Sequence, residues 1–144
     1  MKRHFIFLVL CCVFLTACPP LPRNVMSLFK IEYSSVGKGG SEYILIENKE
    51  LVYIKNRQDT IKRKLRKKHY PELYSLFLKT PLDSLAYVQV PSKKHEYDGA
   101  LATTFTITDI HSKQEYVSPT FDHDNPPEKL KKLIAYMKEL ATKK

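Results

Sequence analysis

The chain has 144 residues, a length that fits one folded domain. Hydrophobic residues make up 43% of it, with 7 Phe and 9 Tyr, and this composition excludes an intrinsically disordered chain. Its 24 Lys and Arg against 15 Asp and Glu leave a formal net charge of +9, which favours anionic partners.

The first 18 residues are arranged like a secretory signal. Lys2-Arg3-His4 precedes an apolar run over residues 5–15, and Leu15-Thr16-Ala17-Cys18 leads into prolines. A cationic start, a short apolar stretch and small residues before the cut are typical of a cleaved signal peptide. Residues 5–17 number 13, fewer than the ~20 apolar residues that a transmembrane helix needs.

Leu15-Thr16-Ala17-Cys18 resembles the lipobox of bacterial lipoproteins. The resemblance implies that residues 1–17 are removed and that Cys18 becomes an acylated N-terminus. Cys18 would then be the only cysteine left, so no disulfide framework is expected. The next residue is Pro19, not the aspartate that resembles an inner-membrane retention signal. This favours the periplasmic face of the outer membrane.

Residues 18–27 are expected to form a proline-rich tether, and residues 28–144 a single globular domain. An extended polyproline II tether reaches ~25–30 Å, so the domain would stay close to the membrane. Removal of Lys2 and Arg3 lowers the formal net charge from +9 to +7. The expected partners are the membrane and an envelope protein or anionic polymer. Export argues against nucleic acid.

Hydrophobic patterns predict strands and a short helix in the first half of the domain. Residues 60–67 fit a strand or a helical turn, because Ile61 and Leu65 are four apart, and we favour a strand. Pro71-Glu72 then opens a helix over residues 71–78, since proline suits the first helical turn. Three earlier strands are expected, over residues 28–36, 42–47 and 51–55.

The second half predicts further strands and a longer helix. Asn125 is expected to cap this helix, with Pro126 in its first turn and Glu128 completing a capping box. The strands are expected over residues 85–90, 100–110 and 115–121. The helix has an apolar stripe made by Leu130, Leu133, Ile134, Met137 and Leu140. Its outer face is expected to carry Lys129, Lys131, Lys132 and Lys138.

Together these elements predict an α+β fold, an antiparallel sheet of about six strands with two helices on one face. The order of two or three strands followed by a helix occurs twice. Similar sequence motifs recur at similar offsets, which is compatible with an internal duplication but does not establish one.

A basic run over residues 55–69 is the first candidate site. Asp59 is the only acidic residue in it. Such a run is typical of a solvated edge strand, where lysines discourage pairing with other chains. It also fits electrostatic contact with anionic headgroups. The residues assigned to an anionic surface are Lys62, Arg63, Lys64, Arg66, Lys67 and Lys68.

Residues 91–99 form the second candidate site. Asp98-Gly99 is a strong turn signal between two predicted strands. Loop tips on a rigid sheet often contact partners. The residues expected at this tip, as a partner-binding loop, are His95, Glu96, Tyr97 and Asp98.

An enzyme or a metal site is the competing interpretation. It would use His95, Asp98, His111, Asp122 and His123, provided that they converge in one pocket. Neither HExxH nor a calcium-loop pattern supports a metal, and no GxSxG surrounds Ser92 or Ser118. No cofactor is expected.

We therefore expect a non-enzymatic periplasmic lipoprotein that binds or assists an envelope protein or polymer. A small periplasmic hydrolase or metal-dependent enzyme is the first alternative. A structural linker between membrane and cell wall, acting through the lysine-rich surface, is the second.

Overall fold

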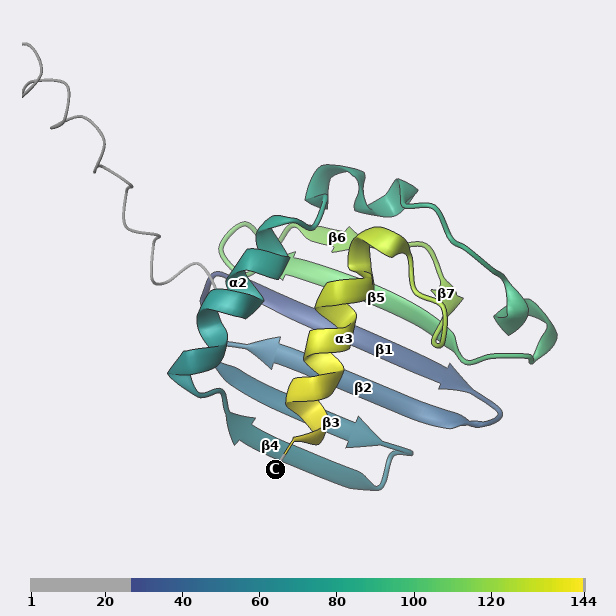
Figure 1. Ribbon diagram of the computed structural model, residues 1–144, viewed down its shortest axis with the longest axis horizontal. Coiled ribbons are helices and arrows are strands. Elements are labelled where there is room, and N and C mark those ends of the chain that lie inside the picture. The colour runs from purple at the N-terminus through teal and green to yellow at the C-terminus, as the bar shows by residue number, and fades with distance from the viewer. Residues whose placement is uncertain (1–26, 144) are drawn as a thin grey trace, which may run out of the picture.

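The computed structural model describes residues 27–143, which form a seven-stranded antiparallel sheet and two α-helices (Figure 1). The predicted signal peptide, Cys18 and the tether up to residue 26 lie outside the described residues. No helix within residues 27–143 is long and apolar enough to cross a membrane.

The first half of the domain is a series of antiparallel hairpins, as the alternating patterns predict. Asn48 and Lys49 have φ angles of 47° and 69°, the left-handed pair that a two-residue hairpin turn requires. The strand favoured over residues 60–67 is confirmed as far as Lys64. The strands are β1 (Phe29–Gly37), β2 (Gly40–Glu47), β3 (Glu50–Lys55) and β4 (Asp59–Lys64). They lead through η3 (Lys67–His69) into α2 (Tyr70–Leu78).

The second half adds strands on the other side of β1 and the longer helix. Two 3₁₀ segments come first, η4 (Leu82–Tyr87) and η5 (Lys94–Tyr97). They are followed by β5 (Ala102–Asp109), β6 (Glu115–Val117), β7 (Phe121–Asp122) and α3 (Glu128–Thr142). The sheet order is β4-β3-β2-β1-β5-β6, and β7 pairs with the start of β5.

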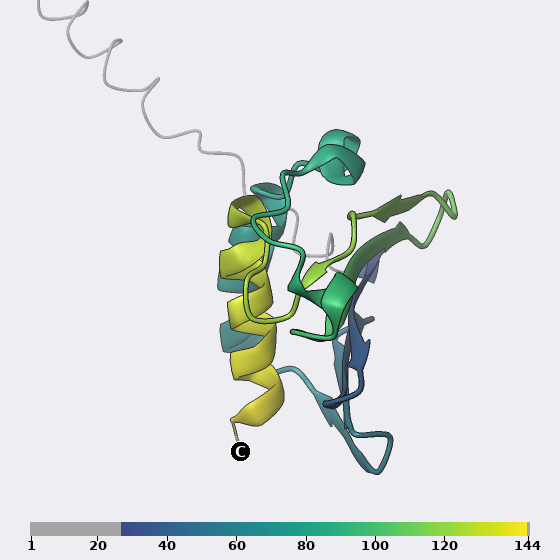
Figure 2. The same ribbon diagram turned by 90° about the vertical axis from the view of Figure 1, so that its right-hand side faces the viewer.

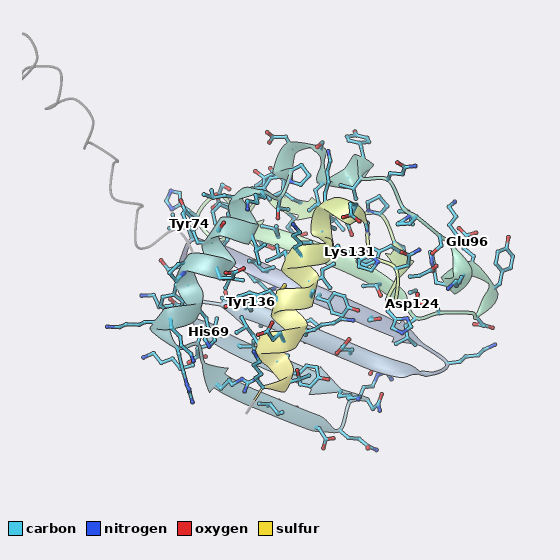
Figure 3. The ribbon with its side chains drawn as sticks, viewed as in Figure 1. His69, Tyr74, Glu96, Asp124, Lys131 and Tyr136 are labelled. Atoms are coloured by element: carbon cyan, nitrogen blue, oxygen red, sulfur yellow. The ribbon has the colours of Figure 1, made fainter. Side chains whose placement is uncertain are left out.

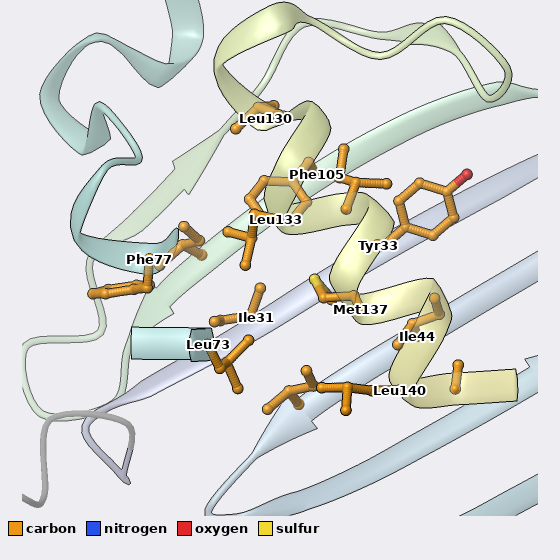
Figure 4. Close-up of a cluster of buried hydrophobic side chains, with 14 of the residues drawn as sticks. Ile31, Tyr33, Ile44, Leu73, Phe77, Phe105, Leu130, Leu133, Met137 and Leu140 are labelled. Carbon is orange, nitrogen blue, oxygen red and sulfur yellow. The ribbon is translucent and has the colours of Figure 1, made fainter. Parts of the chain in front are cut away.

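The two helices cover one face of the sheet, and in the described part of the chain no helix covers the other (Figure 2). Side chains of successive strand residues point to opposite faces, so Ile31 and Tyr33 face the helices while Glu32 does not. The α+β architecture with two helices on one face is therefore confirmed. The core beneath α3 includes Tyr33, Phe105, Leu130, Leu133 and Met137 (Figure 4).

The strand predicted over residues 85–90 is wrong. Residues 82–87 are the 3₁₀ segment η4, in which Leu85 is fully buried and Tyr87 is exposed. The next buried residue is Val88, three positions after Leu85. This spacing follows the three-residue turn of a 3₁₀ helix and not the two-residue period of a strand.

The strand predicted over residues 115–121 is interrupted. Pro119 has no N–H to offer the sheet. The side chain of Ser118 replaces a strand partner, since its Oγ accepts a hydrogen bond of 3.0 Å from the backbone N–H of Phe105. The segment is therefore divided into β6 and β7.

The predicted cap of the last helix is also wrong. The helix begins at Glu128, its N-cap residue is Pro127, and no side chain caps it. Each proline disfavours the helical conformation in the residue before it, so consecutive prolines keep Asn125 and Pro126 outside the helix. The Asn125 amide instead donates a hydrogen bond of 2.9 Å to Ser92 Oγ.

The prediction that Lys138 lies on the outer face of the last helix is also wrong. Its ammonium lies 4.7 Å from the centre of the Tyr33 ring and 3.2 Å from Glu42 Oε2. Position 138 follows Ile134 by four residues and therefore lies at the edge of the apolar stripe. The long aliphatic stem extends the hydrophobic layer while the charge is paired.

Candidate functional site

The register of the strands defines two ends of the sheet. At the first, which we call the basic end, β1 begins and β4 ends, with Phe29 opposite Asp109 and Glu50 opposite Lys64. At the other, the hairpin end, Gly37 pairs with Gly40. The nine residues of β1 separate the two ends by roughly 27 Å.

The predicted basic site is divided by the strand alternation of β4. Lys62 points to the uncovered face of the sheet, where its ammonium lies 3.2 Å from Glu50 Oε2. Arg63 points to the helix side and donates hydrogen bonds to the carbonyl oxygens of Leu140 and Lys143. These carbonyls belong to the last turn of α3 and to its C-cap, so Arg63 caps the C-terminal end of the helix.

The other four residues of this site are exposed at the basic end. Leu65 donates a backbone hydrogen bond of 2.8 Å to Lys49, which holds the start of this segment against the β2–β3 turn. Within residues 27–143 none of the four takes part in a salt bridge. They are Lys64, Arg66, Lys67 and Lys68, named the basic cluster below.

His69 directly follows the basic cluster and is the N-cap residue of α2. Its Nδ1 lies 3.0 Å from the hydroxyl of Tyr136. Burial lowers the pKa of His69, and the positive charges of Lys68 and Arg66 lower it further. Lys68 and Arg66 of the cluster thus place positive charge close to this imidazole.

The predicted partner-binding loop lies near the hairpin end and is held in place by hydrogen bonds to Asp122. The carboxylate of Asp122 is fully buried. It accepts hydrogen bonds from Ser92 Oγ at 2.6 Å and from the backbone N–H groups of Lys94 at 2.9 Å and His95 at 2.8 Å. His95 Nδ1 lies 2.6 Å from the same carboxylate and must carry the proton, because an ionised carboxylate only accepts.

The state of Asp122 follows from these contacts. Burial by itself would raise the pKa of this carboxyl. The hydrogen bonds from Ser92, His95 and Lys94 outweigh burial and hold the pKa well below its usual range. Asp122 is therefore ionised and holds four donors of one loop in place.

The loop tip that this anchor supports presents an aromatic ring. Tyr97 is 83% exposed. Glu96 is paired with Lys93 at 3.4 Å, and Asp98 is paired with Lys38 of the β1–β2 turn. His95 instead belongs to the anchor, since only 11% of its side chain is exposed. Figure 3 shows Glu96 and His69 at opposite ends of the molecule.

The residues proposed for catalysis do not converge in one pocket. His95 and Asp122 are in contact, but Ser92 is bonded to Asp122 and not to the imidazole that would have to activate it. His123 Nδ1 accepts a hydrogen bond of 3.2 Å from the Leu101 N–H. His111 lies in the β5–β6 turn at the basic end.

Of the remaining residues considered for catalysis, Asp98 is held by Lys38, and Ser118 Oγ donates to the carbonyl of Pro119. Within residues 27–143 there is no group of three or more His, Cys, Asp or Glu side chains able to hold a metal ion.

Two functional roles had no clear signal in the sequence. Asp122 anchors a loop 27 residues before it, and Arg63 closes a helix 77 residues after it. The contact of Lys138 with the core could have been predicted, because its four-residue spacing from Ile134 places it at the edge of the apolar stripe of α3.

Comparisons with known protein families, curated proteins and solved structures found no match for this chain.

Proposed function

We propose that this chain is a membrane-anchored lipoprotein of the bacterial envelope, a non-enzymatic binding module with a lipid-facing and a partner-facing end. In this proposal Cys18 carries the acyl chains and residues 18–27 connect it to β1. The basic end lies against anionic headgroups, and the loop that carries Tyr97 meets an envelope protein.

The observation that carries this proposal is the position of the basic cluster. The described chain begins at the same end of the sheet at which Lys64, Arg66, Lys67 and Lys68 are exposed. A domain tethered there would hold these side chains close to the lipid. Each basic residue near an anionic surface contributes ~1 kcal/mol. The anchor would make even this weak contact effective, because it raises the local concentration.

The partner-facing end is supported by the anchoring of its loop. Exposed aromatic residues on rigid backbone lose little conformational freedom on binding and are frequent centres of protein interfaces. Tyr97 fits this description, since its loop is held by Asp122 while its ring is exposed. Its loop is held to the β1–β2 turn at the hairpin end by the ion pair of Asp98 with Lys38, at the opposite end of the sheet from the basic cluster. A membrane at the basic end would leave Tyr97 accessible.

The lipid anchor is tested by metabolic labelling with a fatty-acid analogue. The wild-type chain should be labelled and fractionate with membranes, and Cys18→Ser should lose the label. An unlabelled wild-type chain would overturn the proposal at its first step.

The orientation is tested with the acylated full-length protein reconstituted in vesicles that contain brominated lipid. A fluorophore on Ser112→Cys, in a turn at the basic end, should be quenched more when phosphatidylglycerol replaces part of the phosphatidylcholine. A fluorophore on Gln58→Cys, at the hairpin end, should not respond. High salt should abolish the difference, because the Debye length falls to about 3 Å at 1 M.

Charge variants identify the residues responsible. Arg66→Gln/Lys67→Gln/Lys68→Gln should remove the dependence on phosphatidylglycerol. The matched control Lys55→Gln/Arg57→Gln/Lys132→Gln removes the same number of charges elsewhere and should retain the dependence. Equal loss in both variants would mean that only net charge matters and that the basic end has no special orientation.

A further inference from the structure

A groove of about 650 Å³ lies between η4 with the residues after it and the first turn of α3. It shares no residue with the basic cluster or with the loop tip at residues 95–98. One wall includes Ser84, Tyr87 and Gln89, and the other includes Glu128, Lys129 and Lys131. Lys131 is visible on the first half of α3 in Figure 3.

The groove combines one open aromatic ring with polar side chains. Tyr87 is 86% exposed, the largest exposed fraction among the large hydrophobic side chains of the described chain. Val88 and Pro127 also line the groove, but both are buried. Ser84 and Gln89 on the first wall are exposed and polar, Pro91 on the same wall is exposed, and Pro126 on the second wall is half-buried.

The charges on the second wall favour an anionic ligand. Lys131 is paired with Glu128 at 3.6 Å. Lys129 forms no salt bridge with any described residue. Two ammonium groups against one carboxylate leave the groove positive, and the first turn of the 15-residue helix α3 adds to this potential.

The shape and chemistry favour a sugar chain over a peptide. The walls are a 3₁₀ segment and a helix turn, so the groove offers no open strand edge to which an extended peptide could add. A sugar ring instead offers an apolar C–H face that can stack on an aromatic ring. Its hydroxyl groups bind amide and hydroxyl side chains such as Gln89 and Ser84.

We propose that this groove binds a carboxylate-bearing glycan strand of the cell wall. A sugar ring stacks on Tyr87, hydroxyl groups bond to Gln89 and Ser84, and carboxylates pair with Lys129 and Lys131. The proposal depends on the envelope location argued above. It gives the module a polymer ligand at a site separate from both the lipid contact and the Tyr97 loop.

The test is co-sedimentation of the full-length acylated protein, held in detergent micelles, with purified peptidoglycan sacculi. A second arm uses glycan strands from which an amidase has removed the stem peptides. The amidase frees the lactyl carboxylates of the strand, which carry stem peptides in amide linkage in intact sacculi. The wild-type protein should therefore bind sacculi and should bind the stripped strands more tightly. Tyr87→Ala should weaken binding about tenfold, whereas Tyr87→Phe keeps the ring and should bind like the wild type.

The charged wall is tested in the same assay. Lys129→Gln/Lys131→Gln should weaken binding and reduce its dependence on salt. The matched control Lys55→Gln/Lys132→Gln removes two exposed lysines outside the groove and should bind normally.

Three outcomes would overturn the proposal. Tyr87→Ala binding like the wild type would exclude the groove. Binding to sacculi but not to stripped strands, with displacement by a poly-glutamate peptide, would identify a peptide ligand. No binding to either polymer would exclude the glycan as the ligand.

The vesicle assay separates this inference from the proposed function. If the fluorophore at Ser112→Cys still responds to phosphatidylglycerol while no glycan binds, only the glycan inference is wrong. If the glycan binds but the fluorophore does not respond, the proposed lipid contact is wrong.

Discussion

At the scale of single residues, Asp122 shows how a buried charge can organise a surface loop. Its carboxylate is removed from water, yet four donors from Ser92, Lys94 and His95 replace the lost hydration. An uncompensated charge in this place would cost several kcal/mol. The loop conformation and the ionisation of Asp122 are therefore mutually dependent.

Asp122→Asn should lower the free energy of unfolding at neutral pH by about 2–4 kcal/mol. The neutral amide offers one acceptor oxygen in place of two and adds donors that face the loop N–H groups. Urea denaturation measures the loss, and hydrogen exchange at the amides of Lys94 and His95 should accelerate. A variant as stable as the wild type would mean that the loop is held by other contacts.

The same residue predicts how stability depends on pH. Folding lowers the pKa of Asp122, so its stabilisation is present above the unfolded-state value of ~3.9 and is lost as the pH falls toward the folded-state value. The stability difference between wild type and Asp122→Asn should therefore shrink between about pH 5 and pH 2. A difference that stays constant over this range would show that the carboxyl does not titrate with folding.

At the scale of elements, the edge strand β4 and the helix α3 are joined by one side chain. The basic run looks uniform in the sequence, but the alternation of a strand sends Arg63 toward the helices and Lys62 and Lys64 away from them. Arg63 then binds the carbonyls that end α3. Part of the basic run is therefore structural.

Arg63→Ala should lower the free energy of unfolding by about 1–2 kcal/mol, because two carbonyls at the end of the helix lose a charged donor. Lys64→Ala removes the neighbouring charge from an exposed site and should change the free energy of unfolding by less than about 0.5 kcal/mol. Thermal or chemical unfolding of both variants makes the comparison. Equal losses would contradict the assignment of Arg63 to the helix.

At the scale of the whole molecule, the domain has a core on one side of its sheet only. Leu51 lies under the helices and is fully buried, whereas Leu45 lies on the uncovered face and is half-buried. Both are leucines in neighbouring strands, β3 and β2. Substitution of the same side chain at these two positions therefore compares how much the covered and the uncovered face contribute to stability.

Leu51→Ala should cost about 2–5 kcal/mol of unfolding free energy, as other buried leucines do. Leu45→Ala should cost about 1 kcal/mol, because water already reaches part of its side chain. Urea titration of both variants gives the two values. A large loss at Leu45 would mean that another part of the protein, or a second copy, covers the open face.

Much of this fold could be predicted from local patterns. Strand-favouring residue types predicted β1 and β5. Alternation predicted the β2–β3 hairpin and the apolar stripe predicted α3, because these periods record which face of an element is buried. The same reasoning failed at residues 85–90, because residues 85–87 belong to the 3₁₀ segment η4. It also failed at Asn125, whose amide is used by Ser92 and not by the helix.

The candidate sites could be located but not interpreted. The basic run and the loop at residues 91–99 are visible as charge and turn signals. That Arg63 serves a helix, that His95 is an anchor and that Tyr87 stands beside a groove depend on partners far away in the chain. A single sequence contains no record of such distant contacts.

The sequence by itself determined the segments that alternate or repeat with a helical period, the strongly basic surface, and the resemblance of residues 15–18 to a lipobox, which stays a prediction. Only the tertiary structure decided which charges are free and which are used, because that depends on the side chains that packing brings within a few ångströms. Asp122 and His95, Arg63 and Leu140, and Tyr33 and Lys138 meet through the fold alone.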